Sequence, residues 1–141
     1  MKPMQTSFDE AEFAPYAVAG TSAITGQAFL KTRGGEVRLG AGNTVGLLPV
    51  TSYTTELRRR VTLGGERVGP VDSRVERYRH TTVADGNGNF EFRNLPAGEY
   101  YVTCMIVWEV PSQYGLQKTG GIAYGTVKVG AGETAKVVVT R

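Results

Sequence analysis

One segment of the chain already contains two strands and the turns around them. Asp85 to Asn89 supplies the glycine and asparagine residues that adopt positive φ in tight turns. Phe90 and Phe92 then alternate onto one face, and residues 95–98 (Leu-Pro-Ala-Gly) form a second turn before an alternating run that starts at Tyr100. The pattern predicts two successive β-strands, with Phe90 and Tyr100 in the core.

The composition extends this interpretation to the whole chain. Glycine contributes 19 of the 141 residues and proline 6, and both are spread among valine, threonine and tyrosine. This composition favours many strands joined by turns, and the length suits one domain with a single core. We therefore expect an all-β fold, a single antiparallel β-sandwich of about seven strands. Cys104, the only cysteine, is expected to be a buried thiol.

The chain divides into an N-terminal arm, residues 1–22, and a body, residues 23–141. The arm has no regular period, and its aromatic residues Phe8, Phe13 and Tyr16 indicate an extended segment that lies on the body or on a neighbouring molecule. Further strands of the body are expected at residues 23–30, 37–39, 45–50 and 100–110, followed by a loop at 111–121 and a closing hairpin of 122–129 with 134–140.

Residues 51–80 form an insertion between two of these strands. Tyr53, Leu57 and Val61 recur at every fourth position, which predicts a short amphipathic helix that is capped by Thr54 or Thr55 and ended by the Gly64-Gly65 pair. The formal net charge of the chain is +3, and all of this excess lies in the insertion. The helix should turn Arg58, Arg59 and Arg60 outward, and the insertion is expected to cover Tyr101, Met105 and Val107, the apolar residues on the second face of the strand at 100–110.

The turn-and-strand segment and the final strands at 127–129 and 137–139 resemble carboxypeptidase regulatory-like domains. These domains belong to the transthyretin-like (prealbumin-like) β-sandwiches and also look like the B-type repeats of bacterial surface proteins. The resemblance covers about residues 23–50 and 80–140, whereas the insertion departs from the family's compact pattern. It implies a non-catalytic module that is periplasmic, on the cell surface or secreted, although the first residues do not have the apolar core of a signal peptide.

Catalytic machinery and cofactors are not expected. His80 is the only histidine, and acid–base or nucleophilic catalysis usually requires an imidazole oriented by a carboxylate. The hydrolase known in the transthyretin-like group uses several histidines and a C-terminal Tyr-Arg-Gly-Ser, and this chain has neither. Asp85, Asn87 and Asn89 alternate as calcium ligands would, but no bidentate acidic ligand follows, and a tight turn explains the same residues.

Two binding functions remain open. The main expectation is a module that binds a protein partner or forms a homo-oligomer, and the alternative is a carbohydrate-binding module. Nucleic acid is not expected as a partner, because aromatic residues are not interleaved with the basic cluster, and no apolar run is long enough for a membrane-spanning helix. The candidate partner-binding residues are Arg58, Arg59, Arg60, Phe8, Phe13 and Tyr16, and the candidate carbohydrate-binding residues are Trp108, Tyr114 and Tyr124.

Overall fold

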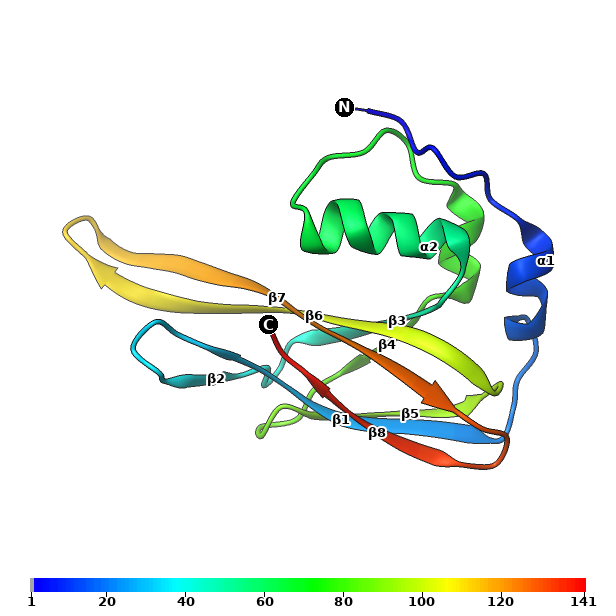
Figure 1. Ribbon diagram of the computed structural model, residues 1–141. Coiled ribbons are helices and arrows are strands. Elements are labelled where there is room, and N and C mark those ends of the chain that lie inside the picture. Colours follow the sequence, from blue (N-terminus) through cyan, green and yellow to red (C-terminus); the bar gives the residue numbers. More distant parts are fainter. Residues whose placement is uncertain (1) are drawn as a thin grey trace.

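The computed structural model describes residues 2–141 and contains eight strands and several short helices (Figure 1). The strands are β1 (Ser22–Lys31), β2 (Val37–Leu39), β3 (Thr44–Pro49), β4 (His80–Val83), β5 (Asn89–Leu95), β6 (Gly98–Ser112), β7 (Gly115–Val129) and β8 (Thr134–Val139). The helical segments are α1 (Glu10–Phe13), the 3₁₀ turn η1 (Ala14–Tyr16), α2 (Ser52–Leu57), its π-helical continuation η2 (Arg58–Leu63) and the 3₁₀ helix η3 (Ser73–Tyr78).

The strands form two four-stranded sheets that pack face to face. One sheet has the order β4-β3-β6-β7, and in the other β1 pairs with β2, β5 and β8. Side chains that alternate inward from both sheets form the core, which includes Ile24, Leu47, Phe90, Tyr100 and the thiol of Cys104. The predicted all-β sandwich with a helix-containing insertion is confirmed, as are the core positions of Phe90 and Tyr100.

The last strand does not close a hairpin, and here the sequence prediction was wrong. β7 and β8 belong to different sheets, and β8 runs parallel to β1 from Ala23↔Thr134 to Ala28↔Val139. The turn between them crosses from one sheet to the other, and the amide of Ala23 donates to the carbonyl of Glu133 at its end. Every other strand pair in the described chain is antiparallel.

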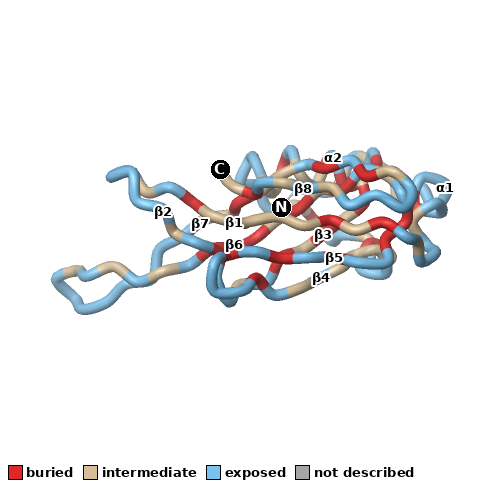
Figure 2. The backbone as a smooth tube through the Cα atoms, turned by 90° about the horizontal axis from the view of Figure 1, so that it is seen from below, coloured by how far each residue is buried: buried red, intermediate tan, exposed pale blue. Residues whose placement is uncertain are grey.

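Residues 111–121, expected to be a loop, instead extend β6 and β7 into a long two-stranded ribbon that projects from the body (Figures 1 and 2). Pairing continues to Ser112↔Gly115, so the turn consists of Gln113 and Tyr114 alone. Pro111 is tolerated in the strand because the ribbon extends past β3, where this edge of β6 has no partner strand among residues 2–141. Proline and glycine were therefore misleading signals of a loop.

The insertion forms the predicted helix. α2 begins with a capping box in which Thr51 and Thr54 bond to each other's backbone amides, so Thr51 rather than Thr54 or Thr55 is the cap. The helix ends at the Gly64-Gly65 pair, where Gly65 has φ +65°. It lies over the outer face of β3 and β6, where the Thr55 hydroxyl is 2.8 Å from that of Tyr101.

The insertion covers less of this face than expected. Tyr101 is half-buried beneath the helix, but Met105 is 51% exposed and Val107 is 45% exposed. Both lie beyond the end of β3 on the projecting ribbon, where the helix does not reach. The expectation of a full cover is therefore wrong for these two side chains.

The N-terminal arm lies against the insertion and contains the short helix α1 and the turn η1. Phe13 is fully buried, and its ring packs 4.5 Å from that of Phe8 and 4.8 Å from that of Tyr78. Tyr53 and Val75 complete this second apolar cluster, which is separate from the sandwich core.

Candidate functional site

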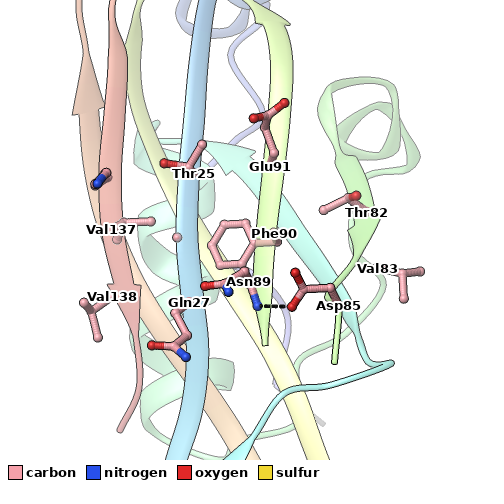
Figure 3. A pocket seen from close by; sticks show the side chains of 12 residues that line it. Thr25, Gln27, Thr82, Val83, Asp85, Asn89, Phe90, Glu91, Val137 and Val138 are labelled. Atoms are coloured by element: carbon pink, nitrogen blue, oxygen red, sulfur yellow. Dashed lines mark hydrogen bonds between the residues drawn. The ribbon is translucent and has the colours of Figure 1, made fainter. Parts of the chain in front are cut away.

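A polar recess of about 660 Å³ lies over the sheet formed by β5, β1 and β8 (Figure 3). Inward-facing residues such as Ile24 and Ala28 alternate along β1 with Thr25 and Gln27, so the latter two lie on the outer face. The strand register then places two rows of side chains across this face: Asn89, Gln27 and Val138 in one row, and Glu91, Thr25 and Lys136 in the other.

Gly26 lies between the two rows on β1. Its cross-strand partners are Phe90 and Val137, and both also line the recess. A Cβ atom at position 26 would lie 2.6 Å from the Phe90 ring and even closer to the Val137 carbonyl oxygen. Glycine is therefore required where three strands and the Phe90 ring approach closely.

The turn at Asp85–Asn89 forms one end of the recess. The Asp85 carboxylate accepts hydrogen bonds from the amides of Asn87 (2.9 Å) and Asn89 (3.0 Å), the second of which is visible in Figure 3. Gly88 has φ +77°, and the Gln27 side chain donates to the carbonyl of Asn87. The predicted tight turn is present, but the strands that it joins, β4 and β5, lie in different sheets.

The polar groups of the recess suit hydrogen bonding to a neutral or weakly charged ligand. Glu91 forms an ion pair with Arg93, whereas Lys136 has no ion pair with any residue from 2 to 141. The recess thus combines two hydroxyls, two amides, the carboxylates of Asp85 and Glu91, and one ammonium group. Within residues 2–141, no three His, Cys, Asp or Glu side chains lie close enough together to hold a metal ion.

The three aromatic residues predicted to bind carbohydrate do not lie together. Tyr114 is 82% exposed at the tip of the ribbon. The register places Trp108 and Tyr124 on opposite faces of the β6–β7 pair. An arginine also covers each of these two rings, since the guanidinium carbon of Arg38 lies 5.7 Å from the Trp108 centroid and that of Arg58 lies 5.5 Å from the Tyr124 centroid.

The predicted protein-contact residues are also less accessible than expected. Of the three consecutive arginines only Arg59 is exposed; Arg58 is half-buried, and Arg60 is buried in an ion pair with Glu56. The outward direction is confirmed for Arg59 but was wrong for Arg60, which pairs with the buried Glu56 and donates to the carbonyl of Pro3 in the arm. In the arm, Phe13 is buried, while Phe8 and Tyr16 are half-buried against the body.

His80 lies on the edge strand β4 and is half-buried beside a recess of about 400 Å³ that Tyr16 and Tyr78 also line. Burial lowers the pKa of its imidazole below the usual 6.5, so the neutral form is favoured. The imidazole forms no hydrogen bond with any side chain or backbone group of residues 2–141. No carboxylate of residues 2–141 therefore orients this imidazole in the way that acid–base catalysis usually requires.

The sequence patterns pointed to Asn89 alone among the residues of the two rows, as part of the turn and as a calcium ligand that was considered and set aside. Alternation in β1 and β5 could have identified Thr25, Gln27 and Glu91 as outward-facing. Lys136 could not have been placed beside them, because the parallel pairing of β8 with β1 was not evident.

Comparisons with known proteins support the fold. No family model matches the chain, and no curated protein matches it. Among solved structures, a crystal structure from Pseudomonas aeruginosa named a "putative carbohydrate binding protein" superposes with a TM-score of 0.83 at 26% sequence identity. The match covers 96% of this chain and 99% of that one, so the shared architecture includes most of the arm and the insertion as well as the sandwich. No helix within residues 2–141 is long and apolar enough to cross a membrane.

Proposed function

We propose that this protein is a non-catalytic carbohydrate-binding module whose ligand lies in the recess over β5, β1 and β8. The main support for this proposal is the arrangement of side chains on three paired strands. Gln27 and Asn89 in one row, and Thr25, Glu91 and Lys136 in the other, face one open recess. The name of the Pseudomonas aeruginosa structure, which shares the fold over almost the whole chain, supports the same ligand class.

The geometry suits a sugar for a physical reason. A pyranose presents several hydroxyl groups around a ring, and each needs a donor or an acceptor when water is displaced. Gln27 and Asn89 offer both, Thr25 offers a hydroxyl, and Glu91 and Lys136 offer charge-assisted hydrogen bonds. Because these groups come from paired strands, little ordering of the backbone is needed when a ligand binds.

The test is a titration of the ¹⁵N-labelled protein with soluble oligomers of glucose, N-acetylglucosamine and galacturonic acid. At least one oligomer should shift the amide resonances of β1, β5 and β8. Thr25→Val should weaken that binding by about tenfold, since it removes one hydroxyl and keeps the strand preference. Thr126→Val is the matched control, because Thr126 is exposed on β7 in the other sheet. Resonance shifts that map to other surfaces, or an equal loss of sugar affinity in both variants, would contradict the proposal.

The biological setting follows from the resemblance to carboxypeptidase regulatory-like domains, which are mostly appendages of envelope, secreted or surface proteins. A module of this kind would hold its parent protein or complex on a glycan outside the cytoplasm. Fractionation of the source cells, with the protein detected by antibody, tests this location.

A protein-contact role is the second candidate, and the projecting ribbon favours it. Leu116 is 68% exposed and lies with Tyr114, Met105 and Val107 on a ribbon with unpaired edges, and exposed apolar groups of this kind are common at protein interfaces. The exposed Arg59 of the insertion would add a charged contact. Light scattering should show association that Leu116→Lys reduces, while Arg59→Glu should weaken a contact that depends on salt.

A further inference from the structure

We infer that the gap between the insertion helix and the outer face of β3 and β6 is a binding site for one oxyanion, of the size of phosphate or sulfate. The insertion helix and the sheet of β1, β5 and β8 lie on opposite sides of the sandwich (Figure 1), so this site is separate from the recess over that sheet. It does not depend on the proposed function.

Arg58 provides the first observation. Its guanidinium carbon lies 5.0 Å from the centroid of Tyr101 and 5.5 Å from that of Tyr124, so cation–π contacts with two rings hold the group against the sheet. Its Nε atom is inaccessible to solvent and has no hydrogen-bond partner among residues 2–141. Arg58 also forms no ion pair with any of these residues, unlike Arg60 and Arg79 of the same insertion. A cation that lines a cavity without a counter-ion attracts an anion into it.

Arg79 provides the second observation. Its Nε and Nη2 atoms donate to Glu76, at 3.0 and 3.3 Å, which fixes the guanidinium plane and leaves Nη1 directed at the sheet. The position that a Cβ on Gly46 would occupy is 3.6 Å from Arg79 Nη1 and 3.4 Å from the hydroxyl oxygen of Thr103. The glycine therefore leaves an open space that faces a guanidinium N–H and a hydroxyl group.

The two arginines line one cavity of about 50 Å³. Because one water molecule needs roughly 10–15 Å³ in this measure, the space suits a few waters or one tetrahedral oxyanion. Thr62 and Thr103 also line it, and no aspartate or glutamate does. Leu48 and Leu57 form an apolar wall, which lowers the local dielectric constant and strengthens the attraction of the arginines for an anion.

The experiment is a titration of the ¹⁵N-labelled protein with sodium phosphate and, separately, with sodium chloride at equal ionic strength. Phosphate should shift the Arg58 Nε–H resonance, which is identified by its loss in Arg58→Lys, and chloride should not. Arg79→Gln should weaken phosphate binding about tenfold, as expected when one charge-assisted hydrogen bond is lost. Arg59→Gln, which removes an equal charge from the exposed face of the same helix, should change binding less than twofold.

Gly46→Ala keeps the test valid if the arginine variants are unstable. A methyl group at this position makes only ordinary contacts, so the protein should fold, but it occupies the space and should reduce phosphate affinity. A parallel titration with glucose 6-phosphate distinguishes a site for the free ion from one that takes the terminal group of a larger molecule. The inference is wrong if phosphate and chloride act alike, or if Arg59→Gln weakens binding as much as Arg79→Gln does.

Discussion

Arg60 Nη1 lies 2.7 Å from Glu56 Oε2, one helical turn earlier, and both side chains are buried. The same carboxylate accepts hydrogen bonds from the amides of Gln5 (2.9 Å) and Thr6 (2.6 Å), and Arg60 donates to the carbonyl of Pro3 at 3.0 Å. One ion pair within the insertion therefore holds the backbone of the N-terminal arm. The hydrogen bond from the Gln5 amide, followed by the interaction with the Thr6 side chain, is the main reason why the pKa of Glu56 is lowered to about 2.

The first prediction is that Arg60→Met releases the arm and destabilises the protein. The substitution leaves a buried carboxylate without its cation, so the melting temperature should fall by something on the order of 10 °C. Arg59→Met is the control and should melt close to the parent, because Arg59 is exposed. Protease digestion should cut the arm faster in Arg60→Met alone. Equal melting temperatures for the two variants would show that the pair contributes little.

The second prediction concerns acid. Glu56 has a usual pKa of 4.5 and Asp72 one of 3.8, and both fall to about 2 in the folded protein, the latter mainly through hydrogen bonds from the Arg74 side chain. A lowered pKa contributes stability that is complete above the unfolded value and is lost as the pH falls through the folded one. Urea unfolding should therefore show a loss of stability between about pH 5 and pH 2.

Glu56→Gln isolates one part of this acid effect. The variant should be less stable than the parent at pH 7, and the difference should shrink as the pH approaches 2, because the parent then protonates Glu56 as well. A constant difference across this pH range would mean that Glu56 is not the group responsible.

The alternating patterns of the sequence predicted the sandwich well where one face of a strand is buried. Phe90 and Phe92 occupy the core as their spacing requires, and the helix of the insertion forms where Tyr53 and Leu57 repeat. These features depend on local periodicity and on turn residues, which a single sequence contains.

Pairing between distant strands was much harder to predict. The alternation of Val137 and Val139 indicates a strand, but it does not show with which sheet or in which direction that strand pairs. The candidate recess depends on that choice, since Lys136 reaches Thr25 only through the parallel pairing. Likewise, Arg60 was predicted to point outward because the helical period does not show that Glu56, one turn earlier, is buried. The burial of Glu56 depends on contacts with the arm.

The third prediction is that Gly26→Ala destabilises the sandwich. A methyl group there would collide with the Phe90 ring and with the backbone carbonyl of Val137, and a backbone atom cannot move aside cheaply. The cost should be about 1–3 kcal/mol, as for other overpacked positions. Gly86→Ala is the matched control, because a Cβ at that position meets no atom within 4 Å. Chemical denaturation of both variants measures the difference, and similar values would mean that β8 can move away from β1.

The final prediction is that Phe90→Ala both weakens the fold and opens the recess. The Phe90 ring is buried in the core, packs edge-on against Phe92 with centroids 5.8 Å apart, and closes the recess beneath Gly26. Truncation should cost roughly 3–5 kcal/mol of unfolding free energy, whereas Val138→Ala, on the exposed face of β8, should cost far less. Phe90→Leu keeps most of the volume and should fold with an intermediate loss. If the protein is a carbohydrate-binding module, this leucine variant should also bind its sugar more weakly than the parent, because the floor between the two polar rows has changed. A Phe90→Ala protein that melts within a degree or two of the parent would contradict the packing of β5 against the core.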